Sequence, residues 1–273
     1  MKLQYTTEAL LYKVSDGIAT ITLNRPHEGN SLTADLVRGV QAAWEDVKGN
    51  PEVRVAIITG ADESHFCTGA SVSELDTSDE GIGLQNGTLR EVVRVSSYQN
   101  EVWKPVICAV NGLVNGAGLH FIVDADIVVA SQTSVFMDTH VNIGQVGALE
   151  NIGLARRMSF GGAMLLTLLG RDYRMPADRA FQLGLVDVIE PGAEATRTRA
   201  RELAQSIAKN SPQALTLSKQ AIWKSMEQGY QQSLEYGWQL VKQQWHHPDF
   251  REGPKAFVEK REPQWNPDPN ATE

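Results

Sequence analysis

Short apolar runs alternate along the chain with segments of helical periodicity, and this alternation predicts an α/β fold. Residues 9–14 and 18–23 alternate apolar and polar positions on either side of a Ser-Asp-Gly turn, which indicates two strands. Residues 53–59 and 106–110 are short, mostly apolar and rich in β-branched residues, as buried strands are. The first half of the chain is therefore expected to contain a largely buried sheet.

Longer segments with apolar residues at helical spacing follow these runs. After the candidate N-cap Ser31, Leu36, Val40 and Trp44 recur on one face of a segment that extends to residue 47. Similar patterns predict further helices at residues 88–103, 147–169, 193–209, 212–226 and 227–245. The chain thus changes from mixed strands and helices to helices alone towards its C-terminus.

A turn of small residues separates the run at 106–110 from a second apolar run that carries one histidine. Residues 114–118 are Val-Asn-Gly-Ala-Gly, and residues 119–123 are apolar except for His120. Such a turn lets another group approach the backbone, and a helix that begins after it presents N–H groups that can bind an oxyanion. The alternative is a crossover turn whose glycines only permit close packing.

Composition and charge narrow the possible classes of function. The chain has 273 residues, 42% hydrophobic and 21% charged, which is ordinary for a globular protein. A net charge of -8 argues against binding to nucleic acid. The two cysteines, Cys67 and Cys108, form neither a disulfide framework nor a pair with metal-ligand spacing, so no metal site is expected.

No segment of the sequence predicts export or insertion into a membrane. The N-terminal residues lack an apolar core of signal-peptide length, and no later stretch reaches about 18 uninterrupted apolar residues. A soluble, reducing and cytoplasmic setting is therefore expected.

The small-residue turn lies within a longer motif. Ala109-Val110-Asn111-Gly112 precedes it and Asp126-Ile127 follows it, which resembles the signature of the crotonase (enoyl-CoA hydratase/isomerase) superfamily. The resemblance covers nearly the whole chain, and it implies an α/β fold of the ClpP/crotonase type, a spiral of ββα units in two roughly perpendicular sheets. It also implies a core at residues 1–205 and a helical region at 206–273 that assembles a homotrimer, or a hexamer of two trimers.

The resemblance further implies an acyl-CoA substrate, with coenzyme A as part of that substrate and no separate cofactor. Residues 66–72 resemble the motif F-x-x-G-x-D-hydrophobic, with Ser71 in place of the usual aspartate. In the family, the backbone amides at the positions of Ala70 and Ala117 form the oxyanion hole. The expected contacts with the substrate and coenzyme A are Arg25, Ala70, Ser71, Val72, Ser73, Ala117, Phe257 and Lys260.

Two of these contacts lie in a C-terminal segment that resembles the family's E-G-x-x-A-F-x-E-K-R. Phe257 and Lys260 are three residues apart, so they are expected on one face of a helix, covering the adenine and its phosphates, often across a subunit boundary. Without the motif, this segment is a charged amphipathic helix and Arg25 is a solvated loop residue.

Two histidines occupy the positions at which the family's hydratases carry catalytic glutamates. His120 follows the small-residue turn, and His140 lies in a segment, residues 136–144, that resembles F-G-x-P-E-x-x-x-G. A histidine can replace a carboxylate as a general base because its ordinary pKa, about 6.5, lies near neutral pH. Either histidine alone would more often be a core residue, but the double coincidence favours a catalytic pair.

This pair is similar to the β-diketone hydrolase branch of the superfamily. The leading prediction is therefore a retro-Claisen reaction, the hydrolysis of a C–C bond in a β-keto or cyclic keto-acyl-CoA, with the departing enolate held by the two amides. Glu150 is expected to orient His140 or the attacking water, or else to be a carboxylate at the surface or at a helix start.

Three alternatives to this reaction stay open. The first is an enoyl-CoA hydratase or isomerase of fatty-acid or ring catabolism, a lyase in place of a hydrolase. The second is a catalytically silent CoA-binding homologue, and the third is an enzyme that acts on a free diketone.

Overall fold

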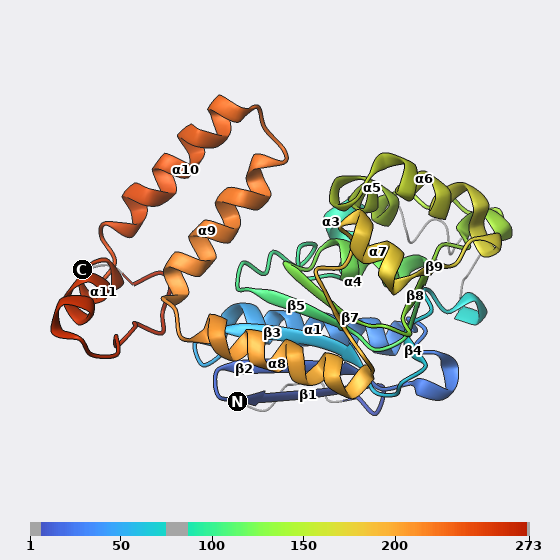
Figure 1. The fold of residues 1–273 in the computed structure, drawn as a ribbon, viewed down its shortest axis with the longest axis horizontal. Helices are drawn as coiled ribbons and strands as arrows, with labels where there is room; N and C mark the ends of the chain where they lie inside the picture. Colours follow the sequence, from blue (N-terminus) through green and yellow to red (C-terminus); the bar gives the residue numbers. More distant parts are fainter. Residues whose placement is uncertain (1–6, 75–86, 272–273) are drawn as a thin grey trace.

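The computed structural model describes residues 7–74 and 87–271, and the described part contains two sheets (Figure 1). The larger sheet has the strand order β1-β2-β3-β5-β7-β10, in which β1 and β2 are antiparallel and the other neighbours are parallel. Its strands are β1 (Leu10–Ser15), β2 (Ile18–Leu23), β3 (Val55–Gly60), β5 (Val106–Val110), β7 (Ile127–Ser131) and β10 (Val188–Glu190).

The smaller sheet has the order β4-β6-β8-β9 and is built from short strands. They are β4 (His65–Cys67), β6 (Leu113–Asn115), β8 (Val135–Met137) and β9 (Met175–Pro176). The strands β4, β6 and β8 each follow a strand of the larger sheet after a short turn. The pairs in chain order are β3 and β4, β5 and β6, and β7 and β8. The predicted α/β class is confirmed, and the strand pairs repeat in the manner expected of ββα units.

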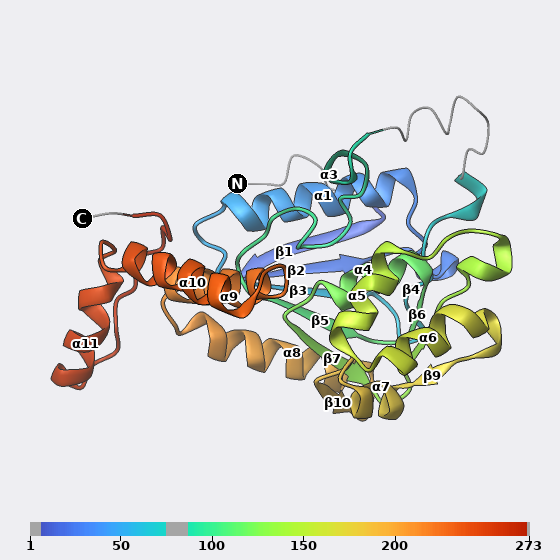
Figure 2. The same ribbon diagram turned by 90° about the horizontal axis from the view of Figure 1, so that it is seen from above.

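Two helices cover the two faces of the larger sheet, as Figure 2 shows from above. The face towards α1 (Ala34–Gly49) buries Ala56 and Ile58 in the main core, whereas Val55 and Ile57 pack in a second cluster with alanines of α8 (Ala193–Ala208). Because successive side chains of a strand point to opposite faces, a strand covered on both sides needs apolar residues throughout. This explains why the run at 53–59 does not alternate.

The C-terminal helices project from the end of the larger sheet (Figure 1). α9 (Pro212–Ser225) and α10 (Tyr230–Gln244) form an antiparallel hairpin, and α11 (Asp249–Glu259) follows it. The predicted helices at 212–226 and 227–245 are thereby confirmed. The predicted boundary at residue 205 falls within α8, and residues 1–6, 75–86 and 272–273 lie outside the described part.

One side of α10 carries an exposed apolar stripe: Tyr230, Leu234, Trp238, Val241 and Trp245. Exposed apolar patches of this kind mark interaction surfaces in soluble proteins. The trimer or hexamer stays a prediction, and this stripe is a surface that such an assembly would cover.

Two predicted helices differ from the structure. The segment 88–103 contains only α3 (Leu89–Val92) and then continues as a loop, because side chains of the loop bind its own backbone amides, as Gln99 does to Val95 and Ser96. The stretch 147–169 is divided into α5 (Leu149–Arg157) and α6 (Phe160–Leu169), because Ser159 caps the second helix by accepting from the amide of Gly162.

No helix within residues 7–74 and 87–271 combines the length and the apolar character that crossing a bilayer requires.

Candidate active site

The two histidines that the sequence singles out come together at one edge of the smaller sheet. His120 lies in the first turn of α4 (Leu119–Val123), which follows β6, and His140 begins a 3-10 helix (His140–Ile143) that follows β8. β6 and β8 are parallel neighbours, with Asn115 paired to Met137. Because parallel strands end at the same edge of a sheet, the segments after them lie side by side.

The imidazole of His140 is held through its Nδ1 atom. Nδ1 lies 2.6 Å from Asp138 Oδ1 and 3.2 Å from Glu150 Oε1. Ionised carboxylate oxygens only accept hydrogen bonds, so Nδ1 carries the proton and Nε2 presents a lone pair. The hydrogen bond with Asp138 raises the pKa of His140. No other group in the described ranges pairs with Nε2, so this atom is the free base of the site.

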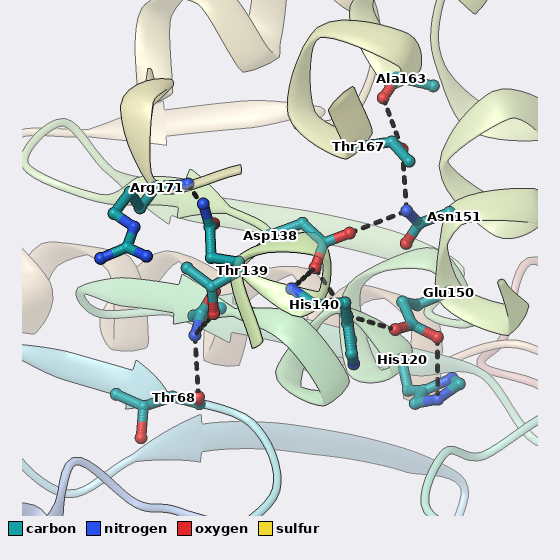
Figure 3. A network of polar contacts seen from close by, with 12 residues as sticks. Thr68, His120, Asp138, Thr139, His140, Glu150, Asn151, Ala163, Thr167 and Arg171 are labelled. Atoms are coloured by element: carbon teal, nitrogen blue, oxygen red, sulfur yellow. Dashed lines mark hydrogen bonds and ion pairs between the residues drawn. The ribbon is translucent and has the colours of Figure 1, made fainter. Parts of the chain in front are cut away.

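Asp138 is fully buried and is itself held in place. Its Oδ2 accepts from Asn151 Nδ2 at 2.8 Å, and the same amide donates to Thr167 Oγ1 at 2.8 Å (Figure 3). Burial would raise the pKa of Asp138, but the hydrogen bonds from His140 and Asn151 together hold it below its ordinary value. Asp138 is thus an anionic partner that orients His140.

Glu150, in the first turn of α5, joins the two histidines. Figure 3 shows its carboxylate between the two imidazole rings, with Oε1 near His140 and Oε2 3.5 Å from Nε2 of His120. The side chain is only 6% exposed. The expectation that Glu150 approaches His140 therefore agrees with its place in the structure. Burial contradicts the alternative of a surface carboxylate, whereas Glu150 does lie at a helix start, and its role in the reaction stays a prediction.

His120 is buried in the helix that follows the turn. Its pKa is lowered, mainly because burial disfavours the charged imidazolium, while the neighbouring Glu150 opposes this effect. Its other ring nitrogen, Nδ1, lies 3.0 Å from Nε2 of Gln99. His120 faces the network that contains His140, a point that the sequence alone left open.

The amides of Ala70 and Ala117 lie in adjoining segments. Leu32 N donates to Gly69 O at 2.8 Å, and Ser71 N donates to Leu32 O at 3.1 Å, so the amide of Ala70 between them is not used in this bridge. Gly69 has a φ of 94°, and a Cβ there would lie 3.1 Å from the nitrogen of Ala117. Their role as an oxyanion hole stays a prediction, which this proximity favours.

The small-residue turn at residues 114–118 also lies against His140. Gly116 has a φ of 51°, and a Cβ built on it would lie 3.4 Å from Cε1 of His140. A Cβ on Gly147 would lie 3.1 Å from Nδ1 of the same ring. The imidazole is therefore in contact with two backbone segments, and its Nε2 would lie 3.9 Å from a Cβ on Gly116, in the turn that carries Ala117.

The predicted contacts with coenzyme A divide into two groups. Arg25 forms an ion pair with Glu28, and Ser71 contacts Ser73 across the exposed Val72, near the amide of Ala70. Ser71, Val72 and Ser73 directly follow Ala70 in the segment after β4. Arg25 lies in the loop between β2 and α1, whose Gly29 carbonyl accepts from the amide of Thr68. Their roles stay predictions.

Phe257 and Lys260 lie elsewhere. α11 is at the opposite end of the molecule from the smaller sheet in both views (Figures 1 and 2). Phe257 is 86% exposed, so within one chain it contacts no part of the site. The prediction that the two share a helix face is wrong in detail, because α11 ends at Glu259 and Lys260 takes a left-handed φ of 54°.

Three supporting residues were missed by the sequence reasoning: Gln99, Asp138 and Asn151. Asp138 had a detectable signal, because a carboxylate two residues before a candidate base can reach that base within one turn. Gln99 had none, since it lies in a segment predicted to be helical. Within the described ranges, no group of three or more His, Cys, Asp or Glu is arranged to hold a metal ion.

A cavity of about 840 Å³ adjoins the histidine network. His120 and Gln99 line one part of it, and Asp126, Lys219 and Trp223 line another. Its apolar walls come from α3, α5 and α9, including Val93, Leu149, Ile152, Leu215 and Ile222.

Comparisons with known proteins agree over almost the full length of the chain. A family model described as "Enoyl-CoA hydratase/isomerase" matches residues 13–268. The (E)-benzylidenesuccinyl-CoA hydratase of Thauera aromatica is 33% identical over 92% of this chain and 96% of its own. The short-chain-enoyl-CoA hydratase of Clostridium acetobutylicum is 31% identical over 89% of this chain and 92% of its own.

Solved structures of enoyl-CoA hydratases have the same fold over nearly the whole chain. An enoyl-CoA hydratase/isomerase from Mycobacterium paratuberculosis superposes with a TM-score of 0.85 at 30% identity, covering 96% of this chain and 99% of its own. An enoyl-CoA hydratase from Bacillus anthracis superposes with a TM-score of 0.86 at 28% identity, covering 95% of this chain and 100% of its own.

Proposed function

Because the chain belongs to the enoyl-CoA hydratase/isomerase family and has the crotonase fold, we propose that it adds water reversibly to the double bond of an enoyl-CoA thioester. The names of the relatives favour this reaction over the retro-Claisen cleavage that the histidine pair suggested, since a benzylidenesuccinyl-CoA hydratase and a short-chain-enoyl-CoA hydratase are among them. The alternative raised from the sequence thus replaces the leading prediction.

The observation that carries the proposal is the state of His140. Its Nδ1 is held 2.6 Å from Asp138, and its Nε2 has no partner among the described residues. A nitrogen lone pair at the edge of the oxyanion turn is suited to take a proton from water. The raised pKa of His140 strengthens it as a base, and general base catalysis contributes about 10² to 10⁴-fold to the rate.

The reaction balances with this one base. His140 Nε2 takes a proton from water, and the water oxygen bonds to the β-carbon of the enoyl group. The electron pair of the double bond moves towards the thioester, whose enolate oxygen accepts from the amides of Ala70 and Ala117. The imidazolium then returns the proton to the α-carbon. Each of the two amides is worth about 10² to 10³ in rate if it follows other oxyanion donors.

A second candidate is the hydrolysis of a C–C bond in a β-keto or cyclic keto-acyl-CoA. The carboxylate-supported imidazole favours it, because the same base can direct water at a ketone carbonyl, and the same amides would hold the departing enolate. The two reactions differ in the carbon that water attacks and in whether a C–C bond then breaks.

The test uses purified protein in heavy-oxygen water with crotonyl-CoA and, separately, a cyclic β-keto-acyl-CoA, followed by mass spectrometry. We expect a heavy hydroxyl group in the product of crotonyl-CoA, a loss of about 10² to 10⁴-fold in His140→Ala, and an unchanged rate in His246→Ala. His246 is an exposed histidine and serves as the matched control.

Other outcomes are equally decisive. A heavy carboxylate from the cyclic substrate, with crotonyl-CoA untouched, would replace hydration by C–C bond hydrolysis. Binding of both thioesters without turnover, unaffected by His140→Ala, would identify a silent CoA-binding homologue.

A further inference from the structure

The orientation of the Gln99 amide is fixed by its own loop. Its Oε1 accepts from the backbone amides of Val95 at 2.9 Å and Ser96 at 3.0 Å. The opposite orientation would place the NH₂ group against these two N–H donors, which leaves only one assignment. The NH₂ group therefore points outward, and it lies 3.0 Å from Nδ1 of His120.

The loop that carries Gln99 is attached to the helix that carries His120. Asp124 caps the C-terminus of α4, and its carboxylate accepts from the hydroxyl of Ser96 while its carbonyl accepts from the hydroxyl of Ser97 at 3.0 Å. Ser96 Oγ also accepts from the amide of Gln99. Gln99 and His120 thus belong to one connected unit, and their contact does not depend on a mobile surface side chain.

This contact determines where the proton of His120 sits. A primary amide nitrogen only donates, so Nδ1 of His120 accepts and has no proton. The single proton of the neutral ring is then on Nε2, which faces Glu150 Oε2 at 3.5 Å. A protonated ring would direct a second N–H group at the amide of Gln99, so the contact also disfavours the imidazolium. The lowered pKa of His120 agrees with this.

The two histidines therefore carry their protons on opposite nitrogens. In His140 the proton is on Nδ1, facing Asp138, and Nε2 is free. In His120, Nδ1 accepts from Gln99 and Nε2 lies 3.5 Å from the carboxylate of Glu150. Two residues that look equivalent in the sequence are thus chemically different.

We propose that Gln99 is a positioning residue that fixes His120 as a neutral imidazole with its proton on Nε2, so that His120 holds Glu150 and His140 is the only base of the pair. The role given to His140 rests on the proposed hydration reaction, whereas the proton position of His120 does not. His120 thereby keeps the carboxylate of Glu150 beside Nδ1 of His140, where it supports the positive charge that His140 acquires during turnover.

The first measurement is nitrogen NMR of protein labelled in its histidine rings, recorded from about pH 5.5 to 8.5, a range in which unperturbed histidines titrate. A His120→Asn variant assigns the signals. We expect His120 to show a protonated Nε2 and a bare Nδ1 throughout, and His140 to show the opposite neutral form and to titrate.

The second measurement uses Gln99→Glu. The new carboxylate keeps an acceptor for the amides of Val95 and Ser96, so the loop retains its bonds, but it now offers an acceptor to Nδ1 of His120. We expect His120 to become doubly protonated at neutral pH, an additional ionisation in the pH–rate profile, and a fall in kcat of about 10 to 100-fold. Gln182→Glu makes the same change at an exposed site and should leave both the spectrum and the rate unchanged.

A His120 signal with its proton on Nδ1, or one that titrates near neutral pH in the wild-type protein, would overturn the proposal. So would a Gln99→Glu variant whose His120 signal does not change. Because the spectrum is read without substrate, a protein that fails to hydrate crotonyl-CoA but shows the expected His120 signal would contradict only the proposed reaction.

Discussion

Two polar clusters adjoin the same cavity, the first through His120, and they differ in whether they leave an atom without a protein partner. The first is the histidine network of Asp138, His140, Glu150 and His120. The second, which we name the α9 anchor, consists of Asp126, Lys219 and Trp223 and joins the C-terminal hairpin to the core.

In the α9 anchor the groups of Asp126 and Lys219 all have protein partners. Asp126 Oδ2 lies 2.8 Å from Lys219 Nζ and accepts from the amide of Val106 at 2.7 Å, and Oδ1 accepts from Trp223 Nε1 at 2.8 Å. Lys219 also donates to the carbonyl of Lys104 at 2.9 Å. Each charged atom of this cluster thus has a protein partner, and the contribution of the cluster is to stability.

The histidine network contains the same kinds of groups but leaves one nitrogen, His140 Nε2, without a partner in the described part of the chain. Burial of charge alone therefore does not distinguish a catalytic cluster from a structural one. The unpaired nitrogen distinguishes the two clusters, because only that atom can exchange a proton with a substrate. The comparison predicts opposite consequences for mutations in the two clusters.

The largest effect is expected from His140→Ala. It should lower kcat by about 10² to 10⁴-fold through loss of the base. The midpoint of thermal unfolding should fall less than in Lys219→Met, because Asp138 keeps its hydrogen bonds from Asn151 and from the backbone amide of residue 140. Steady-state kinetics and calorimetry measure the two quantities. A large loss of stability together with a small loss of rate would remove the distinction between the clusters.

Lys219→Met should act in the opposite way. It leaves the carboxylate of Asp126 without its cation, and breaking a buried pair costs about 3 kcal/mol, the lower end of the usual range, because Asp126 is 19% exposed and gains some hydration. Urea unfolding measures the change. Activity per folded molecule should persist at low urea, and an equally large loss of activity would mean that the anchor takes part in the reaction.

Asp138→Asn should shift the pH dependence of the rate. His140 acts as a base only when Nε2 is unprotonated, so the rate falls on the acid side of its pKa, which Asp138 raises above the ordinary value. Removing the charge lowers this pKa, and the acid limb should move to lower pH, with a plateau about 10 to 100-fold lower because the ring is less well oriented. Asp172→Asn, at an exposed site, is the matched control and should leave the profile in place.

Trp223→Phe should have the smallest effect. It removes one hydrogen bond from Asp126, which retains Lys219 and the amide of Val106 and is partly hydrated, so we expect a loss of about 1 kcal/mol in the free energy of unfolding. The rate should not change. A loss as large as that of Lys219→Met would show that the indole, and not the ion pair, dominates the anchor.

The sequence was informative where structure depends on local pattern. The runs at 9–14 and 18–23 became β1 and β2 with their boundaries nearly unchanged, because alternation and a turn triplet act within a few residues. The positions of His120 and His140 relative to the family motifs also sufficed to bring them together, because the motifs carry the strands β6 and β8 that end at one edge.

The sequence was uninformative where a side chain acts far along the chain. Gln99 reaches His120 only because the loop after α3 folds onto the end of α4 through Ser96, Ser97 and Asp124, and no periodicity records such bonds. The motif at Phe257 and Lys260 allowed for a contact across a subunit boundary, which is compatible with the distance of α11 from the site within one chain, and this contact stays a prediction. The sequence analysis predicted a contact of Glu150 with His140. It did not predict the contact with His120, which arises because Glu150 lies in the first turn of α5.

The stripe on α10 also has a consequence for how the protein is produced. An exposed apolar row that includes Tyr230, Leu234 and Trp238 can associate non-specifically with the apolar surface of other, incompletely folded chains. The yield of native protein should therefore depend on the rate of synthesis and on the concentration of the chains. Slow expression at low temperature should reduce aggregation through this surface.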